Sequence, residues 1–232
     1  MPINVKSAAV GTALVASLAI AQQASADIVI SEVDPSGSGN SYAADWFELT
    51  NTGTSAVSIA GWKMDDNSNS FSKAVALHGV NSIAAGQSVV FLEDTSDTDA
   101  NIDAAFIAAW FGGKPPASLT LGAYGGSGVG LSQSGDSVNI FNASGQVVTR
   151  VDFGTASATA TFDNAAGLNN VTLTQLSQVG VNGAFTSIDG EVGSPGSIRA
   201  APVPLPAAAW LLLSGLGALG VMRKRKTGTA AT

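Results

Sequence analysis

The clearest pattern in the chain is an alternation of polar and apolar side chains over residues 45–51, which read Asp-Trp-Phe-Glu-Leu-Thr-Asn. Side chains of a β-strand point alternately to its two faces, so this stretch predicts a short strand with two different faces. Its aromatic residues favour strand structure, and the Asn-Thr-Gly that begins at residue 51 predicts a turn. One face carries Phe47 and Leu49, and the other carries Trp46, Glu48 and Thr50.

Short apolar runs on both sides of this stretch predict further strands. Residues 27–33 form the first one, and residues 87–92 form another directly after an Ala-Gly turn. Between them, a short run with alternating apolar residues leads to Gly61, where we expect a tight turn of the chain ahead of Trp62. Residues 75–83 are apolar without a regular period.

The strongest hairpin signal lies later in the chain. Residues 136–141 and 146–153 alternate in the manner of strands, and the Asn-Ala-Ser-Gly between them predicts the turn. By composition, residues 122–130 form a glycine-rich loop, and residues 155–189 hold irregular edge strands. In the return strand, Val147, Thr149, Val151 and Phe153 are expected on one face.

One segment has helical rather than strand periodicity. Ile102, Phe106 and Trp110 follow one another at intervals of four residues, which places them in one apolar stripe. Thr98 or Asp99 can cap the helix at its N-terminus, and the Gly-Gly-Lys-Pro-Pro that follows the stripe stops it. The pattern predicts a short helix that is inserted between strands and packed on the flank of a β-sandwich.

Four segments in this order resemble the lamin tail domain, an immunoglobulin-like β-sandwich. They are residues 28–33, 45–51, 57–62 and 83–90, and the Gly-Ser-Pro-Gly at residues 193–196 is similar to the way bacterial members of the family close. The resemblance implies a scaffold and interaction module, and the fold of this family does not fix a chemistry.

Composition agrees with an all-β domain. We assign residues 27–199 to the lamin-tail-like sandwich, a length of roughly 175 residues that suits one domain with insertions. Charged residues make up only 12% of the chain, and its 27 glycines favour short strands with many turns. Since the chain has no cysteine, neither a disulfide nor a thiolate metal site is possible.

The first 26 residues have the pattern of a secretory signal peptide. Lys6 supplies the positive start, residues 8–20 form an alanine-rich apolar run, and Ala24 and Ala26 complete an A-x-A cleavage site. This pattern predicts residues 1–26 as a signal helix and Asp27 as the first residue of the mature protein.

The C-terminal end has three parts. Residues 200–206 form a linker with a proline signature, residues 207–222 are apolar and predict a transmembrane helix, and residues 223–232 form a basic cytoplasmic tail. The uncharged stretch of 20 residues from Val203 is just long enough to span a bilayer. The signature consists of Val203, Pro204, Leu205, Pro206 and Ala207, and the membrane stop consists of Arg223, Lys224, Arg225 and Lys226.

This three-part tail resembles the PEP-CTERM class of bacterial sorting signals in its VPLPA variant. The resemblance implies processing between Val203 and Ala207 by an exosortase-type membrane enzyme of a Gram-negative bacterium. It also implies a location at the envelope, with the cell surface or a secreted matrix as the final address. A plain membrane anchor is the alternative.

Charge restricts the partners. All seventeen acidic residues lie between Asp27 and Glu191, and only five basic residues occur between Asp27 and Arg199. A domain of this charge repels phosphate backbones, so we expect no nucleic-acid partner.

Candidate chemistry is sparse. His78 is the only histidine, so a Ser-His-Asp triad can form only through it, and zinc sites built from His and Cys are excluded. Two acidic stretches are candidates for calcium, which takes six to eight oxygen ligands, although neither has the EF-hand spacing. They are residues 65–69 (Asp-Asp-Asn-Ser-Asn) and the group Glu93, Asp94, Asp97, Asp99 and Asp103.

We therefore expect a non-enzymatic exported protein, with no catalytic residue and no required cofactor, that is displayed through its sorting tail. It would act as a structural or binding module, with extracellular matrix, polysaccharide or a protein as its partner. Two alternatives are an envelope hydrolase of polysaccharide or nucleic acid, and a calcium-stabilised adhesin.

Overall fold

The computed structural model describes residues 28–94, 100–164 and 172–196. All of them lie in one of the chain's two units, which runs from Ala24 to Val203. The predicted signal helix and the predicted C-terminal transmembrane helix lie outside these described residues. Within the described part of the chain, no helix has the length and apolar character needed to cross a membrane.

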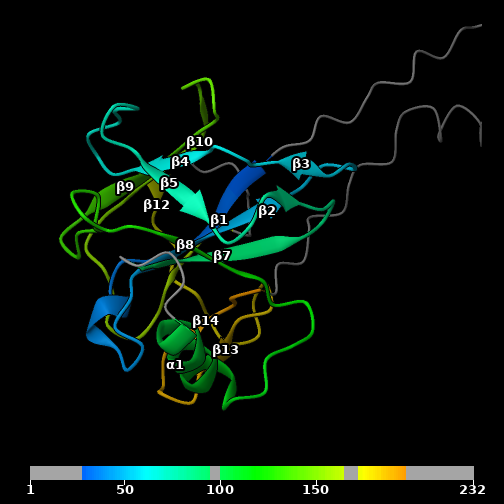
Figure 1. Cartoon of the computed structure of the whole chain (residues 1–232). Coiled ribbons are helices and arrows are strands. Elements are labelled where there is room, and N and C mark those ends of the chain that lie inside the picture. The colour runs from blue at the N-terminus through cyan, green and yellow to red at the C-terminus, as the bar shows by residue number, and fades with distance from the viewer. Residues whose placement is uncertain (1–27, 95–99, 165–171, 197–232) are drawn as a thin grey trace, which may run out of the picture. The chain divides into compact units, whose positions relative to one another are not determined.

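The described residues form many short strands, one α-helix and one 3-10 turn (Figure 1). The elements up to the helix are β1 (Ile28–Asp34), η1 (Gly37–Gly39), β2 (Trp46–Asn51), β3 (Val57–Ser58), β4 (Lys63–Asp65), β5 (Val75–His78), β6 (Ser82–Ile83) and β7 (Ser88–Glu93). The remaining elements are α1 (Ala100–Phe111), β8 (Leu121–Tyr124), β9 (Asp136–Phe141), β10 (Val147–Phe153), β11 (Phe162–Asp163), β12 (Thr172–Leu173), β13 (Phe185–Thr186) and β14 (Val192–Gly193).

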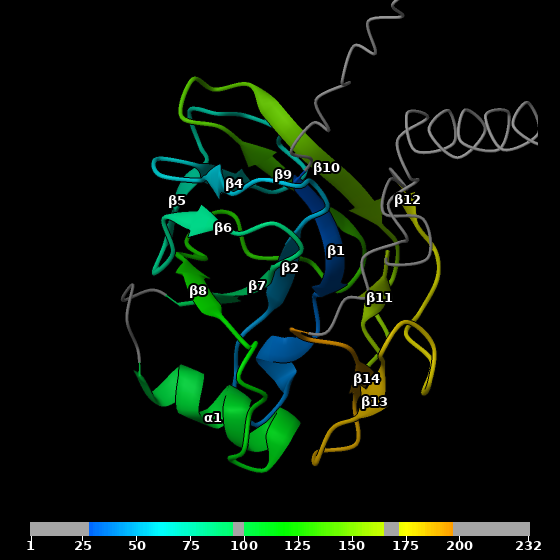
Figure 2. The same cartoon turned by 90° about the vertical axis from the view of Figure 1, so that its right-hand side faces the viewer.

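Ten strands are hydrogen-bonded in the order β11-β1-β2-β7-β8-β5-β4-β9-β10-β12. Strand β5 pairs with β8 on one side and with β4 on the other, so the sheet turns over at β5. The β1-β2-β7-β8 layer then faces the β4-β9-β10 layer (Figures 1 and 2). This arrangement is the expected immunoglobulin-like β-sandwich, and the all-β prediction with one inserted helix is confirmed.

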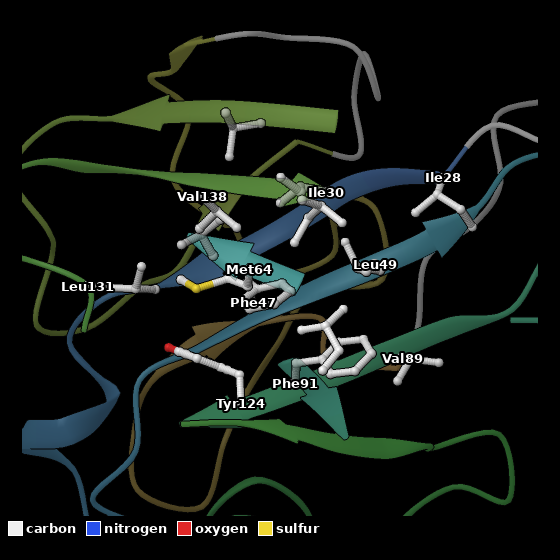
Figure 3. Packing of buried hydrophobic residues seen from close by; sticks show 14 of the residues in the cluster. Ile28, Ile30, Phe47, Leu49, Met64, Val89, Phe91, Tyr124, Leu131 and Val138 are labelled. Carbon is white, nitrogen blue, oxygen red and sulfur yellow. The ribbon is translucent and has the colours of Figure 1, made fainter. Parts of the chain in front are cut away.

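The main core fills the space between the two layers. Phe47 and Leu49 of β2 point into it, as their alternation predicts, and Val138 of β9 lies in the same core (Figure 3). The rings of Phe47 and Phe91 stack with centroids 5.5 Å apart. Burial of this apolar surface is the main force that holds the two layers together.

A second apolar cluster lies on the opposite face of the β1-β2-β7 layer, under α1. Phe106 and Trp110 of the predicted helical stripe are buried there against Trp46, with ring centroids 5.9 Å and 5.8 Å from it. Ile102 is partly buried against the same cluster. The predicted helix and its packing on the flank of the sandwich are therefore confirmed.

Two strand predictions are wrong. Residues 122–124, the start of the predicted glycine-rich loop, belong to strand β8. A glycine is needed there because a Cβ at Gly122 would lie 2.6 Å from the Phe91 ring. In β10 the register shifts between Val147 and Thr149, so Val147 is 47% exposed and does not share the buried face of Phe153.

Trp46 joins the helix to the sheet, and its removal tests that packing. We expect Trp46→Ala to lower the free energy of unfolding by about 3–5 kcal/mol, because it leaves a cavity under Phe106 and Trp110. Urea unfolding followed by circular dichroism measures the change.

Val147→Ala is the matched control for this substitution, because it truncates an apolar side chain that is largely exposed. It should change the free energy of unfolding by less than about 0.5 kcal/mol. Equal losses in the two variants would contradict the assignment of Trp46 as the anchor of α1.

Candidate functional site

Two glutamates lie directly opposite each other on neighbouring strands, Glu32 on β1 and Glu48 on β2. In a regular strand Glu32 would share the face of Ile28 and Ile30, which is the apolar core. The register of β1 shifts between Ile30 and Glu32, and this bulge at Ser31 moves Glu32 to the opposite face. The local irregularity of β1 thus creates the pair.

The carboxyl group of Glu48 is fully buried and held by two parts of the chain. Its Oε1 accepts a hydrogen bond from the Ser31 hydroxyl at 2.8 Å, and its Oε2 accepts one from the Gly196 amide at 2.6 Å. The Thr50 hydroxyl, two residues along the same face, donates in turn to Ser31 at 2.9 Å. Glu48 therefore connects the bulge of β1 to the end of the domain.

The carboxyl group of Glu32 is also fully buried and takes its donors from later segments. The Ser194 amide donates to Oε1 at 2.8 Å, and the Ser194 hydroxyl donates to Oε2 at 3.0 Å. The Thr161 hydroxyl also donates to Oε1. Ser194 lies 162 positions after Glu32, so this carboxyl holds distant parts of the chain together.

Gly193 to Gly196, which we call the closing segment, covers both glutamates. A Cβ at Gly193 would lie 2.7 Å from Glu32 Oε1 and 2.7 Å from the ring of Trp110, so a larger residue does not fit. Ser194 supplies two donors to Glu32, and Gly196 supplies one to Glu48. The Gly-Ser-Pro-Gly sequence is thus explained by steric fit and by hydrogen bonding.

A second acidic cluster adjoins the pair at the end of β1. The Tyr42 hydroxyl lies 2.8 Å from Asp34 Oδ2 and 3.0 Å from Glu191 Oε2. The side-chain amide of Asn40 donates to the same Glu191 oxygen at 2.9 Å. Trp46 Nε1 lies 3.3 Å from the Tyr42 hydroxyl. One phenolic proton cannot serve two acceptors, so this cluster needs a further proton on a carboxyl group.

Burial dominates the electrostatics of the three glutamates. It raises the pKa of Glu48 from its ordinary value of 4.5 to about 8, with a further contribution from the charge of Glu32. It raises the pKa of Glu32 to about 7 against the opposing effect of the hydrogen bonds from Thr161 and Ser194. Burial and the neighbouring Asp34 raise the pKa of Glu191 to about 9. Desolvation and like charges both favour the neutral acid.

Two basic side chains of the described residues are engaged elsewhere. Arg150 forms an ion pair with Asp152, and the Lys63 amino group lies 4.8 Å from the centre of the Phe71 ring. No ion pair among the described residues includes Glu32, Glu48 or Glu191. The three carboxyls are therefore held by hydroxyl and amide donors rather than by cations.

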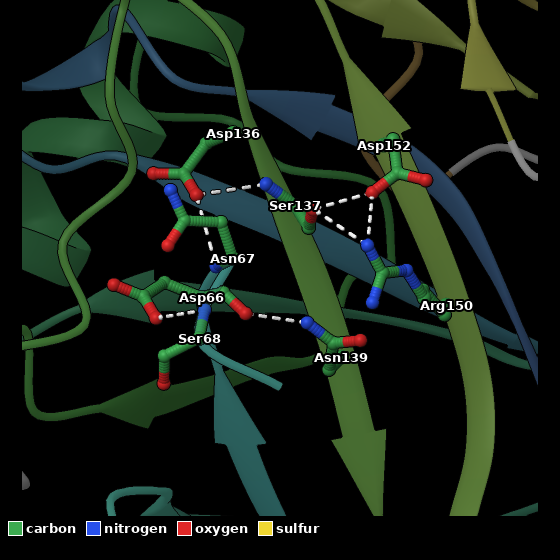
Figure 4. A network of polar contacts seen from close by, with 8 residues as sticks. All are labelled: Asp66, Asn67, Ser68, Asp136, Ser137, Asn139, Arg150 and Asp152. Atoms are coloured by element: carbon green, nitrogen blue, oxygen red, sulfur yellow. Dashed lines mark hydrogen bonds and ion pairs between the residues drawn. The ribbon is translucent and has the colours of Figure 1, made fainter. Parts of the chain in front are cut away.

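A separate polar network holds the loop after β4 against β9 (Figure 4). The Asp136 carboxylate accepts hydrogen bonds from the Asn67 amide at 3.0 Å and from the Ser137 amide at 2.8 Å. The side-chain amide of Asn139 donates to the carbonyl oxygen of Asp66. These bonds join the loop to β9, so they give this acidic loop a structural role.

Two buried oxygens on the strands beside this loop are of interest for calcium. Asp65 Oδ1 and Asn139 Oδ1 are buried without a hydrogen-bond partner, and the two residues are paired across β4 and β9. Two oxygens fall short of the six to eight that calcium takes. Across residues 28–94, 100–164 and 172–196, no three His, Cys, Asp or Glu side chains are grouped to hold a metal ion.

The other candidates from the sequence are spread over the molecule. His78 ends β5 opposite Ala123, and Asp103 lies in the first turn of α1. Glu93 ends β7, and the amide of the next residue, Asp94, donates to the Tyr124 carbonyl. Asp97 and Asp99 lie outside the described residues, as do the cleavage site at Ala24 and Ala26, residues 203–207 of the sorting signature and residues 223–226 of the membrane stop.

With the sandwich and its buried acids described, comparison with known families is informative. The chain matches the family model of the lamin tail domain over residues 21–155. This chain belongs to the lamin tail domain family. No curated protein matches it. The match contains Glu32 and Glu48 in this lamin tail domain but ends before the closing segment that covers them.

The sequence did not identify the buried acids as a group. Glu48 alternates with apolar residues, which is also the pattern of a strand with a solvent-exposed face, and Glu32 is displaced by a bulge that has no glycine or proline to mark it. The available signal was the closing Gly-Ser-Pro-Gly, because two glycines around a hydroxyl residue indicate a close approach to another part of the chain.

The raised pKa values predict that the domain is more stable in mild acid than in mild alkali. Stability is fully present below the ordinary pKa of about 4.5 and is lost as pH rises toward about 7 and 8, where the folded-state carboxyls ionise. Between pH 5 and pH 8 we expect a loss of roughly 2–5 kcal/mol in urea unfolding. Glu48→Gln should reduce this slope, and an unchanged slope would contradict the assignment.

Steric fit at the closing segment gives an independent prediction. Gly193→Ala should lower the free energy of unfolding by about 1–3 kcal/mol at every pH, because Glu32 and Trp110 must move. Gly39→Ala is the matched control, since a Cβ there would meet no heavy atom within 4 Å. Thermal unfolding of both variants measures the difference, and a neutral Gly193→Ala would show that the segment packs loosely.

Proposed function

We propose that this lamin tail domain protein is a non-enzymatic module that is exported and displayed at the envelope of a Gram-negative bacterium. It binds an extracellular polysaccharide or a protein through the rigid surface of its sandwich. The observation that carries the proposal is the inward orientation of its perturbed acids. Glu32 and Glu48 are fully buried and bonded to hydroxyls and amides of the same chain, where a substrate cannot touch them.

Catalytic carboxyls with raised pKa values have to reach a substrate from a cleft. In this domain Glu32 and Glu48 lie instead beneath the closing segment and connect β1 and β2 to the residues around 194. Their chemistry therefore supports a role in holding the fold. A rigid sandwich of this kind presents edges and loops for binding.

Export and display are supported by the two ends of the sequence. Residues 1–26 have the pattern of a cleaved signal, and the tail combines a Val-Pro-Leu-Pro-Ala signature, an apolar run and a basic stop. The partners of this tail are the membrane, through residues 207–222, and an exosortase-type processing enzyme. Such processing would place the acidic domain outside the cell.

Intact mass of the protein recovered from its own cell envelope tests this proposal. We expect a product that lacks residues 1–26 and that ends between Val203 and Ala207, with or without an added group at the new end. Replacing Pro204 and Pro206 by alanine should leave the apolar tail attached, whereas Pro202→Ala, just outside the signature, should not. A full-length native protein would contradict export and processing together.

A further inference from the structure

The closing segment is held to the sandwich by the ionisable pair beneath it. The amides of Ser194 and Gly196 donate to Glu32 and Glu48 at 2.8 Å and 2.6 Å, and the Ser194 hydroxyl adds a third bond at 3.0 Å. Gly193 packs against Glu32 and Trp110 in a space that admits no side chain. Docking of this segment therefore depends on the state of two carboxyl groups.

The charged groups that act on the pair are acidic, and the other elements that pack around it contribute neutral groups. The charge of Asp163 of β11 raises the pKa of Glu32. The charge of Asp34 of β1 likewise raises the pKa of Glu191, which precedes β14. From β7, Ser88 contributes a neutral hydroxyl to Glu48, and from α1, Trp110 contributes a neutral ring. No basic group of the described residues pairs with either glutamate. A second negative charge in this space has no counter-charge.

We propose that Glu32 and Glu48 form a protonation-controlled latch, which holds the closing segment against β1 and β2 while the pair carries protons and releases it when both carboxyls ionise. The released segment would let water reach the two carboxylates, which removes the cost of burying them. The rest of the sandwich keeps its own apolar core and stays folded, so the opening is local.

The direction of the effect follows from linkage. Both carboxyls have ordinary pKa values in the released state and higher values in the docked state, so the released state binds fewer protons. Docking is complete near pH 4.5 and weakens as pH rises, until the docked carboxyls themselves ionise near pH 7 and pH 8. Acid therefore closes the latch, and neutral to alkaline conditions open it.

A consequence for display follows from the order of the chain, since the closing segment ends three residues before the linker with the sorting signature. Opening would lengthen the chain between the sandwich and residues 203–207, which would make the signature more accessible to a processing enzyme. This consequence rests on the proposed function, whereas the latch itself does not.

Hydrogen exchange at single amides of the full chain tests the latch without any processing enzyme. The Ser194 and Gly196 amides are themselves the donors to the glutamates, and the Val90 amide of β7 is the reference in the same sheet. After correction for the intrinsic effect of pH, protection at the two donors should fall about tenfold or more per pH unit between pH 5 and pH 7. Protection at Val90 should fall much less.

Variants separate the two glutamates from a general effect of charge. Glu32→Gln and Glu48→Gln keep an oxygen acceptor but cannot ionise, so each should flatten the pH dependence at the closing segment. Asp66→Asn removes a half-buried carboxylate in the loop after β4 and should leave the dependence unchanged. Gly193→Ala should lower protection at the donors by a similar factor at every pH.

Several outcomes would overturn the latch. One is a protection factor in the natural sequence that does not change between pH 5 and pH 7, a result that needs no variant to fold. Another is a parallel fall at Val90, which would show global rather than local opening. A third is an unaltered slope in both glutamine variants. Failure of tail processing in cells would bear on the proposed function alone.

Discussion

The closure of this sandwich depends on two carboxyl groups that lie side by side in the interior without a cation. Glu32 and Glu48 face each other across β1 and β2, where like charges repel and burial penalises ionisation. Donors from Ser31, Thr161, Ser194 and Gly196 offset part of both effects. Because these donors come from segments far apart in the sequence, the pair can be satisfied only when the domain is complete.

Strand β2 shows how this constraint fits into the architecture. Its core face meets the opposite layer through Phe47 and Leu49. Its other face is covered twice, by α1 over Trp46 and by the closing segment over Glu48. The whole strand is buried for this reason, and different interactions hold the helix and the closing segment in place. The helix contributes aromatic contact, whereas the closing segment contributes hydrogen bonds to carboxyls.

The sequence predicted those features that depend on regular periodicity. Alternation identified the core face of β2, and four-residue spacing identified the buried stripe of α1, because each signal repeats within one element. It could not reveal the bulge at Ser31, since nothing local distinguishes Ser31 from a regular strand position. It also mistook Gly122 for part of a loop, because the need for a glycine there arises from Phe91 of a neighbouring strand. The candidate site was missed for the same reason, since its partners meet only through tertiary structure.

Because the chain has no cysteine, no disulfide can fasten the end of the domain, and the buried pair of glutamates takes this role. A disulfide can fasten the end of a domain, and it does not respond to pH in the physiological range. This chain has no cysteine and fastens the end of its domain to β1 and β2 through Glu32 and Glu48 instead. A fastening made of carboxyls weakens as protons leave, so its strength follows the acidity of the surroundings. The same groups that complete the fold therefore make its last segment the part most sensitive to pH.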